Sequence, residues 1–256
     1  MATDGSFWAM YDAYCSRSSE RESFVFTMDK ITSECSYDSV RSCLSIGPGD
    51  GFHEIAFMVK CAANITKFVA VEEDRESAER LKVQLRKRLP DVEGLVIEVD
   101  FRSWNGPSDP VDLIQMFHVL YDVYYKDVGE RRSLLRKAHD SWLNAGGLLL
   151  VLSVGRSSSE SQGKAYEIYD RLGSPITPWK DIESDILDVG FIKKHAHEIQ
   201  FERDFSNPDE AFLRFYQCHV DHPVTLNDVR SAIEQLYPDG KAYEGFETLA
   251  VFQKAL

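Results

Sequence analysis

An apolar run that leads directly into a glycine-rich turn constrains the fold of this chain more than any other feature. Residues 40–46 predict a strand, residues 47–51 (GPGDG) a tight turn, and residues 54–63 a helix. Glycines allow positive φ and let a ligand approach the backbone closely, and the following helix N-terminus offers free N–H groups. A phosphate-binding loop would need GxxxxGK[ST], and a dinucleotide turn would need glycine where Phe52 stands. The segment therefore predicts a strand–turn–helix unit for another kind of ligand.

The chain after this turn alternates short apolar runs with helical patterns. Further strands are predicted at 68–72, 96–99, 111–117 and 148–154, with helices at 76–89 and 130–143. Such alternation favours a parallel sheet with helices on both faces. Two later runs, 192–201 and 248–252, complete seven strands, and we expect the final one to insert antiparallel. We therefore predict a Rossmann-like α/β fold with a seven-stranded, mostly parallel sheet.

Capping residues mark the predicted helix ends in the second half of the chain. Gly146-Gly147 would close the helix at 130–143, and Gly190 a later one. Asn207, which is followed by Pro208, would start one helix. Thr225, which has an acidic residue three positions later, would start another.

Composition excludes several classes of function. The 256 residues carry a net charge of −13, a field that repels nucleic acid. No apolar run of about 18 residues could span a membrane, and no secretory signal is visible. Five cysteines without a CxxC pair indicate reduced thiols, and the Cys218–His222 segment fits no zinc pattern. We expect a cytoplasmic monomer that binds neither nucleic acid nor membranes and has no metal site.

The spacing GxGxG before a helix is typical of class I methyltransferases, which bind S-adenosyl-L-methionine. A carboxylate at the end of the second strand is placed to accept hydrogen bonds from both ribose hydroxyls. Polar and aromatic residues after the third strand would meet the adenine, and the end of the fourth strand would lie beneath the reacting methyl group. The predicted cofactor-binding residues are Gly47, Pro48, Gly49, Gly51, Glu72, Asp100, Phe101 and Phe117.

The chain resembles the histamine N-methyltransferase family over nearly its whole length. Residues 44–47 before the glycine-rich turn are similar to that family's first motif, and residues 114–121 to its fourth-strand segment, which ends in tyrosine. Residues 19–20 and 28–30 resemble its N-terminal helical lid. The resemblance implies one methyltransferase domain over residues 1–256. Within it, residues 1–36 would form the lid, 37–154 the cofactor-binding core and 155–256 the substrate-side helices and last strands.

The resemblance also implies a set of substrate-binding residues. Glu20 matches the family's acidic substrate-binding residue, and Phe7, Tyr11 and Tyr121 match aromatic rings around the substrate. The chain departs from the family at four positions that make the pocket more acidic and richer in hydrogen-bonding groups. His118 stands where the family has a glutamine, and Asp122 where it has a tyrosine. His195 replaces a cysteine, and Glu247 replaces an asparagine.

These residues predict an S-adenosylmethionine-dependent N-methyltransferase that acts on a small, histamine-like amine or imidazole compound. Glu20, and with it Asp122 or Glu247, would hold a substrate ammonium by charge-assisted hydrogen bonds. His118, with Tyr121 beside it, would orient the nucleophile or accept its proton. Two alternatives remain open: a small-molecule O- or S-methyltransferase, for which His118 would be the base, and a degenerate methyltransferase fold that serves as a binding protein.

Overall fold

The computed structural model describes residues 7–121, 127–159 and 162–255. These residues contain a seven-stranded sheet with the strand order β3-β2-β1-β4-β5-β7-β6. β1 to β5 are parallel, whereas β7 lies antiparallel between β5 and β6. The predicted fold class and the antiparallel insertion of the last strand are therefore confirmed. The strands are β1 (Ser42–Ile46), β2 (Lys67–Glu72), β3 (Glu93–Glu98), β4 (Val111–Phe117), β5 (Leu143–Val154), β6 (Ile192–Asp204) and β7 (Ala242–Gln253).

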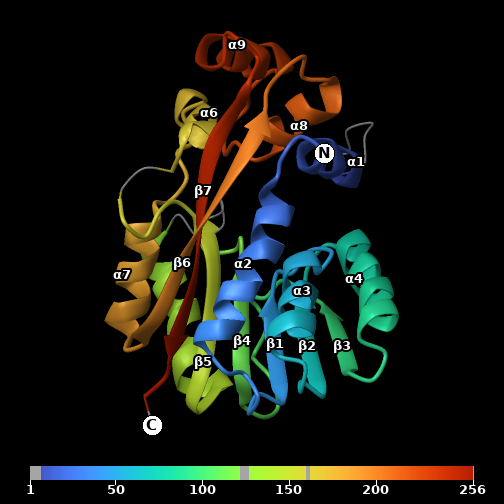
Figure 1. Ribbon diagram of the computed structural model, residues 1–256, viewed down its shortest axis with the longest axis vertical. Coiled ribbons are helices and arrows are strands. Elements are labelled where there is room, and N and C mark those ends of the chain that lie inside the picture. The colour runs from blue at the N-terminus through green and yellow to red at the C-terminus, as the bar shows by residue number, and fades with distance from the viewer. Residues whose placement is uncertain (1–6, 122–126, 160–161, 256) are drawn as a thin grey trace.

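Helices cover both faces of this sheet (Figure 1). One apolar core packs α2 (Glu20–Glu34), α3 (Phe52–Cys61) and α4 (Arg75–Arg88) against one face. A second core packs α5 (Val128–Lys137) and α7 (Trp179–Val189) against the other. None of the helices in the described ranges is long and apolar enough to cross a membrane.

The long β6–β7 pair extends beyond the carboxyl ends of the parallel strands and carries a third group of helices (Figure 1). A separate apolar cluster joins this extension to the first helix of the chain, through residues such as Tyr14, Tyr166, Phe212 and Ile233. The extension therefore faces the edge of the sheet where α/β folds bind ligands. Its helices are α1 (Phe7–Cys15), α6 (Glu167–Arg171), α8 (Glu210–Cys218) and α9 (Leu226–Leu236), with a 3₁₀ turn at Lys164–Tyr166.

Two predicted helix ends are confirmed and two are wrong. Gly190 ends α7 with a φ of 112°, and Thr225 forms a capping box with Asp228 at the start of α9. α8, however, is capped by Asp209, whose side chain accepts from the Phe212 N–H, because the chain is still turning at Asn207.

The predicted cap at Gly146-Gly147 is wrong because these glycines lie inside a strand. α5 runs into a π-helical turn at Ala138–Trp142, and β5 begins directly afterwards at Leu143. The pairing of β4 with β5 then shifts register, because Val111 pairs with Leu143 but Leu113 with Leu148, and the glycine pair lies within this extra length of β5. Gly146 has a φ of 75°, which suits such an irregularity as well as it suits a helix end.

Candidate functional site

The glycine-rich turn between β1 and α3 has the left-handed backbone that its sequence predicts. Gly47, Gly49 and Gly51 have φ values of 59°, 58° and 74°. A Cβ atom on Gly51 would lie 2.3 Å from a methyl carbon of Leu81, so this position excludes any larger residue without rearrangement. A Cβ atom on Gly49 would meet nothing within 4 Å. One glycine is thus required for packing, and the other leaves open space beside the turn.

Glu72 lies at the end of β2 and contacts this turn directly. Its Oε2 atom accepts a hydrogen bond from the Gly49 N–H at 2.8 Å, and its Oε1 atom accepts from the Asp74 N–H at 3.0 Å. Burial raises the pKa of this carboxyl above its usual value, and the two N–H donors oppose that rise. Each oxygen accepts one bond from the backbone and, as a carboxylate oxygen, can accept another.

The other predicted cofactor residues lie in different surroundings. Phe101 is buried, and its ring lies 3.9 Å from a Cβ built on Gly47. Pro48 accepts the Gly51 N–H within the turn. Asp100 lies two residues past the end of β3, which ends earlier than predicted, and its carboxylate pairs with Arg102 at 2.7 Å. Phe117 packs edge-on against Phe24 in the core between the sheet and α2, so the structure does not place this ring at the turn.

A small cavity opens beside the carboxyl end of β4. Its volume is about 150 Å³, and aromatic rings form most of its wall. Of the residues predicted to bind or react with a substrate, six line it: Phe7, Tyr11, Glu20, His118, Tyr121 and Glu247. The remaining lining residues are Tyr14, Tyr166, Tyr169, Ser174, Ile176, Phe215 and His219.

Two predicted substrate residues are not among the described residues that line this cavity. Asp122 lies outside the described residues. His195 is partly exposed on β6, where its Nδ1 atom lies 3.8 Å from Glu34 on α2. Glu247 and His195 belong to adjacent strands, but His195 pairs with Val251, four residues further along β7. The structure therefore places His195 outside this cavity, apart from the other residues that the resemblance grouped with it.

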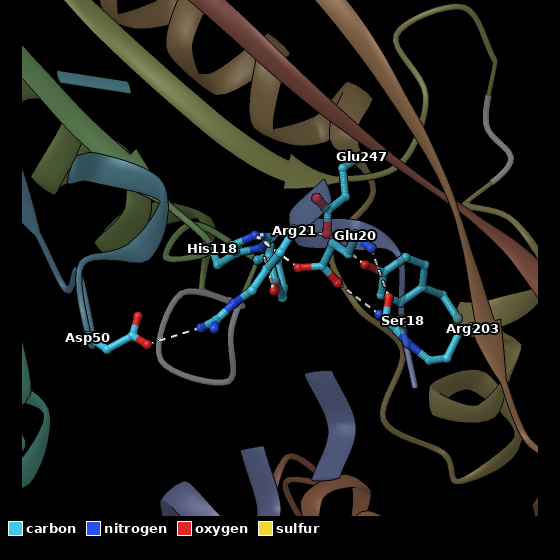
Figure 2. A network of polar contacts seen from close by, with 9 residues as sticks. Ser18, Glu20, Arg21, Asp50, His118, Arg203 and Glu247 are labelled. Atoms are coloured by element: carbon cyan, nitrogen blue, oxygen red, sulfur yellow. Dashed lines mark hydrogen bonds and ion pairs between the residues drawn. The ribbon is translucent and has the colours of Figure 1, made fainter. Parts of the chain in front are cut away.

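Glu20 is the first residue of α2 and forms a buried ion pair. Its Oε2 atom accepts from the Arg203 guanidinium at 2.9 Å, and Arg203 is completely buried. The guanidinium carbon lies 4.1 Å from the ring centre of Tyr14 and 5.2 Å from that of Tyr166. Figure 2 shows Glu20 between Arg203 and His118. A buried charge of this kind requires its partner, so Arg203 fixes the Glu20 carboxylate at the cavity.

His118 follows β4 in a left-handed conformation, with a φ of 58°. A non-glycine residue in this region stores strain, which is most often found at functional sites. Its Nδ1 atom lies 3.0 Å from the Tyr121 hydroxyl, and its Nε2 atom lies 3.8 Å from both Glu20 Oε1 and Glu247 Oε1. Burial lowers the pKa of His118 and so favours the neutral ring, whereas the Glu20 carboxylate opposes this shift.

Glu247 enters the cavity from β7 and is fully buried. The Tyr166 hydroxyl donates to its Oε1 atom at 2.9 Å. Burial and the nearby Glu20 carboxylate raise the pKa of Glu247 well above its usual value. The cavity wall therefore combines one carboxylate paired with arginine and one that is easily protonated.

The first two helices connect the cavity to the glycine-rich turn. Arg21, next to Glu20, forms an ion pair with Asp50 of the turn at 3.0 Å (Figure 2). Its guanidinium carbon also lies 4.3 Å from the ring centre of Phe52. On α1, the buried Trp8 ring lies 4.4 Å from the guanidinium carbon of Arg80 on α4. α1 and α2 therefore lie across both the cavity and the turn.

Sequence reasoning missed Arg203, Tyr166 and His53. Arg203 carried a usable signal, because Ile199, Phe201 and Arg203 alternate as the buried positions of β6. A charged residue at an inward position must be paired with an opposite charge. Tyr166 and His53 showed no comparable signal, since a 3₁₀ turn and a helix start give no information about distant contacts.

No family model and no curated protein matches this chain. Solved structures match most of it at low identity. A proposed methyltransferase from Bacillus halodurans has a TM-score of 0.64 at 13% identity, covering 91% of this chain and 99% of that one. The (4+2)-cyclase SpnF has a TM-score of 0.55 at 13% identity, covering 91% and 81%. Geranyl diphosphate C-methyltransferase from Streptomyces coelicolor, solved with Mg²⁺, geranyl diphosphate and S-adenosyl-L-homocysteine, has a TM-score of 0.52 at 12% identity, covering 90% and 77%.

These similarities show the fold alone, since a fold hosts many unrelated activities. One of the matched structures is a cyclase, so proteins with this fold already differ in activity. The narrower resemblance to histamine N-methyltransferases gains no support from the comparisons. The chain thus has the Rossmann-like fold of class I S-adenosylmethionine-dependent methyltransferases, with a polar, aromatic cavity at the ligand-binding edge of its sheet.

Proposed function

We propose that this protein is an S-adenosylmethionine-dependent methyltransferase whose acceptor is a small molecule with an amine or imidazole nitrogen. One observation carries the proposal. The glycine-rich turn with Glu72 and the cavity with Glu20 and His118 lie at the same edge of the sheet, joined by the Arg21–Asp50 ion pair. A donor at the turn and an acceptor in the cavity would therefore be neighbours.

The residues at the turn fit the cofactor. Open space beside Gly49 leaves room for a ligand against the backbone. Glu72, held by two N–H groups, can still accept hydrogen bonds from two vicinal ribose hydroxyls. Phe101 lies beside Gly47, where a flat base could pack on its ring. When bound, S-adenosylmethionine supplies a methyl group that is already activated on a sulfonium. The protein then has mainly to position the nucleophile.

The cavity suits a small cation. At about 150 Å³ it is smaller than the usual pocket for a drug-sized ligand, which begins at about 300 Å³. Glu20 offers an ionic hydrogen bond to an ammonium group. Phe7, Tyr11 and Tyr121 offer ring faces, which attract cations. A histamine-like amine combines these properties. Glu247, where the resembling family has asparagine, supplies a further acceptor.

His118 provides a neutral base at the reacting centre. Its lowered pKa keeps the ring unprotonated near neutral pH. Its Nε2 atom faces the space between Glu20 and Glu247 and would accept a hydrogen bond or a proton from the nucleophile. Because a buried base would also activate a hydroxyl group, a small phenol or alcohol is the second candidate acceptor.

We further expect the protein to act as a monomer in the cytoplasm.

Calorimetric titration with S-adenosylmethionine and S-adenosylhomocysteine tests the donor site. Glu72→Ala should weaken cofactor binding at least about tenfold, because it removes the acceptor for both hydroxyls. Glu73→Ala is the matched control, since Glu73 is adjacent and exposed. A folded protein that binds neither compound would leave only the fold and would favour a binding protein.

A methyl-transfer screen of amines, imidazoles and phenols tests the acceptor. For an amine substrate, Glu20→Gln should raise KM about 10- to 100-fold, the loss expected for a charge-assisted hydrogen bond, with cofactor affinity retained. Glu22→Gln, an exposed position on the same helix, should leave KM unchanged. Methylation of phenols but not amines would move the assignment to O-methylation.

A further inference from the structure

Three potential metal ligands meet beside the cavity, although they are far apart in the sequence. Glu20 begins α2, His53 lies in the first turn of α3, and His118 follows β4. Each offers one ligand atom, and these atoms lie within 4.8 Å of one another. Glu247 is a fourth potential ligand, because its Oε1 atom lies 3.8 Å from His118 Nε2.

Several polar atoms here are buried without a partner. His53 is only 5% exposed, and its Nε2 atom has no hydrogen-bond partner in the described parts of the chain. The same holds for His118 Nε2 and for Oε2 of the fully buried Glu247. Buried polar side chains almost always have partners, so orphaned atoms on several residues of one cluster indicate a missing ligand.

A second layer of contacts holds His118, Glu20 and Glu247 in place. The Tyr121 hydroxyl is 3.0 Å from Nδ1 of His118, Arg203 donates to Oε2 of Glu20, and the Tyr166 hydroxyl donates to Glu247. Metal ligands are characteristically oriented in this way by outer hydrogen bonds. In His118 and Glu20, this contact occupies one polar atom, Nδ1 or Oε2. The second atoms, Nε2 of His118 and Oε1 of Glu20, lie 3.8 Å from each other.

We propose that Glu20, His53 and His118, with Glu247 within reach, form a binding site for one divalent transition-metal ion of the zinc class. Imidazole and carboxylate together suit zinc and its neighbours, whereas magnesium and calcium prefer oxygen ligands alone. The 3.8 Å separation of His118 Nε2 from each carboxylate oxygen is close to the roughly 3.4 Å edge of a tetrahedron with zinc-length bonds. Small side-chain rotations would close the site.

Metal and ammonium would compete for the same carboxylate. This consequence rests on the proposed methyltransferase function, in which Glu20 holds the cationic acceptor. An ion bound to Glu20 and His118 removes the acceptor's partner and places a positive charge where the ammonium would lie. The metal is therefore an inhibitor that competes with the amine, not a participant in methyl transfer.

Cobalt(II), whose visible absorption reports coordination, is the first probe. The full chain is first treated with a chelator to remove any bound metal, and cobalt is then titrated into the protein. We expect one bound ion with absorption typical of a four- or five-coordinate site. His53→Ala should weaken binding at least about tenfold, the scale seen for loss of groups that support metal sites. His222→Ala removes a partly exposed histidine outside this cluster and should change nothing. Absence of cobalt binding, or equal effects of the two variants, would overturn the proposal.

The competition is tested by methylation kinetics with added Zn²⁺. Zinc should raise the apparent KM for the amine without changing kcat, and His53→Ala should relieve the effect. His53 is not among the cavity-lining residues, so its loss should spare amine binding. Inhibition that is insensitive to His53 would refute the competition. Because cobalt binding requires no activity, a protein that binds the metal but methylates nothing would overturn the proposed function and leave the metal site standing.

Discussion

The two halves of the candidate site are built in opposite ways. The turn side consists of neighbouring segments: β1, the glycine-rich turn, α3 and the end of β2, all between residues 42 and 72. The cavity side draws Glu20, His118, Arg203 and Glu247 from four distant parts of the chain. The first half depends mainly on local backbone geometry, and the second depends on long-range pairing of buried charges.

This difference predicts where each half is vulnerable. Backbone substitutions should damage the turn, whereas substitutions that leave a charge unpaired should damage the cavity. The ion pair between Arg21 and Asp50 joins the halves at a partly exposed position, so its loss should cost least.

The largest expected effect is on the cavity side. Arg203→Met leaves the Glu20 carboxylate buried without its partner, which should lower the free energy of unfolding by about 3–5 kcal/mol. Arg214→Met removes an arginine from the ion pair with Glu210 on the surface of α8 and should cost less than about 1 kcal/mol. Urea unfolding measures both. Similar losses would mean that the buried pair does not govern this half.

The next effect separates two glycines of the turn. Gly51→Ala adds left-handed strain of about 1–2 kcal/mol and a clash with Leu81 that should cost about 1–3 kcal/mol more. Gly49→Ala carries only the strain, because its Cβ meets nothing. Unfolding and cofactor titration of both variants test this. We expect Gly51→Ala to lose more stability and Gly49→Ala to lose cofactor affinity at a smaller stability cost.

A pH effect should follow from Glu72. Burial raises its pKa in the folded protein, so the ionised form disfavours folding, and this cost disappears as pH falls through the folded-state pKa. Cofactor binding has the opposite dependence, because ribose hydroxyls donate to the ionised carboxylate. Affinity should therefore decline as pH falls through the raised pKa. In Glu72→Gln, calorimetry should show weaker binding without this decline; an unchanged pH profile would remove Glu72 from the site.

The smallest effect concerns the link between the halves. Asp50→Asn keeps an acceptor for the Phe52 N–H but removes the charge opposite Arg21. With side chains 26% and 23% exposed, the pair should contribute about 0.2–1 kcal/mol, and less at high salt. Asp29→Asn, which breaks the more exposed Lys60 pair, is the control. A large loss in Asp50→Asn would show that the two halves are strongly coupled.

Much of the turn side was predictable from the chain. The strand–turn–helix unit, the position of Glu72 and the seven-strand fold follow from local periodicity, glycine positions and connection rules. Errors arose where a local signal has two meanings. A glycine pair can end a helix or relieve a strand irregularity, as at Gly146, and an asparagine before proline can cap a helix or form the preceding turn, as at Asn207.

What the sequence determined by itself is therefore the sheet, its order of elements and the glycine-rich turn, because these depend on residues close together in the chain. Only the tertiary structure decided that Arg203 pairs with Glu20, that His53 approaches His118, and that His195 lies outside the cavity. These contacts depend on how α2 and the β6–β7 extension pack across the sheet edge. Buried charges must be paired, and this requirement constrains that packing; the alternation in β6 can mark Arg203 as buried, but no local pattern names its partner.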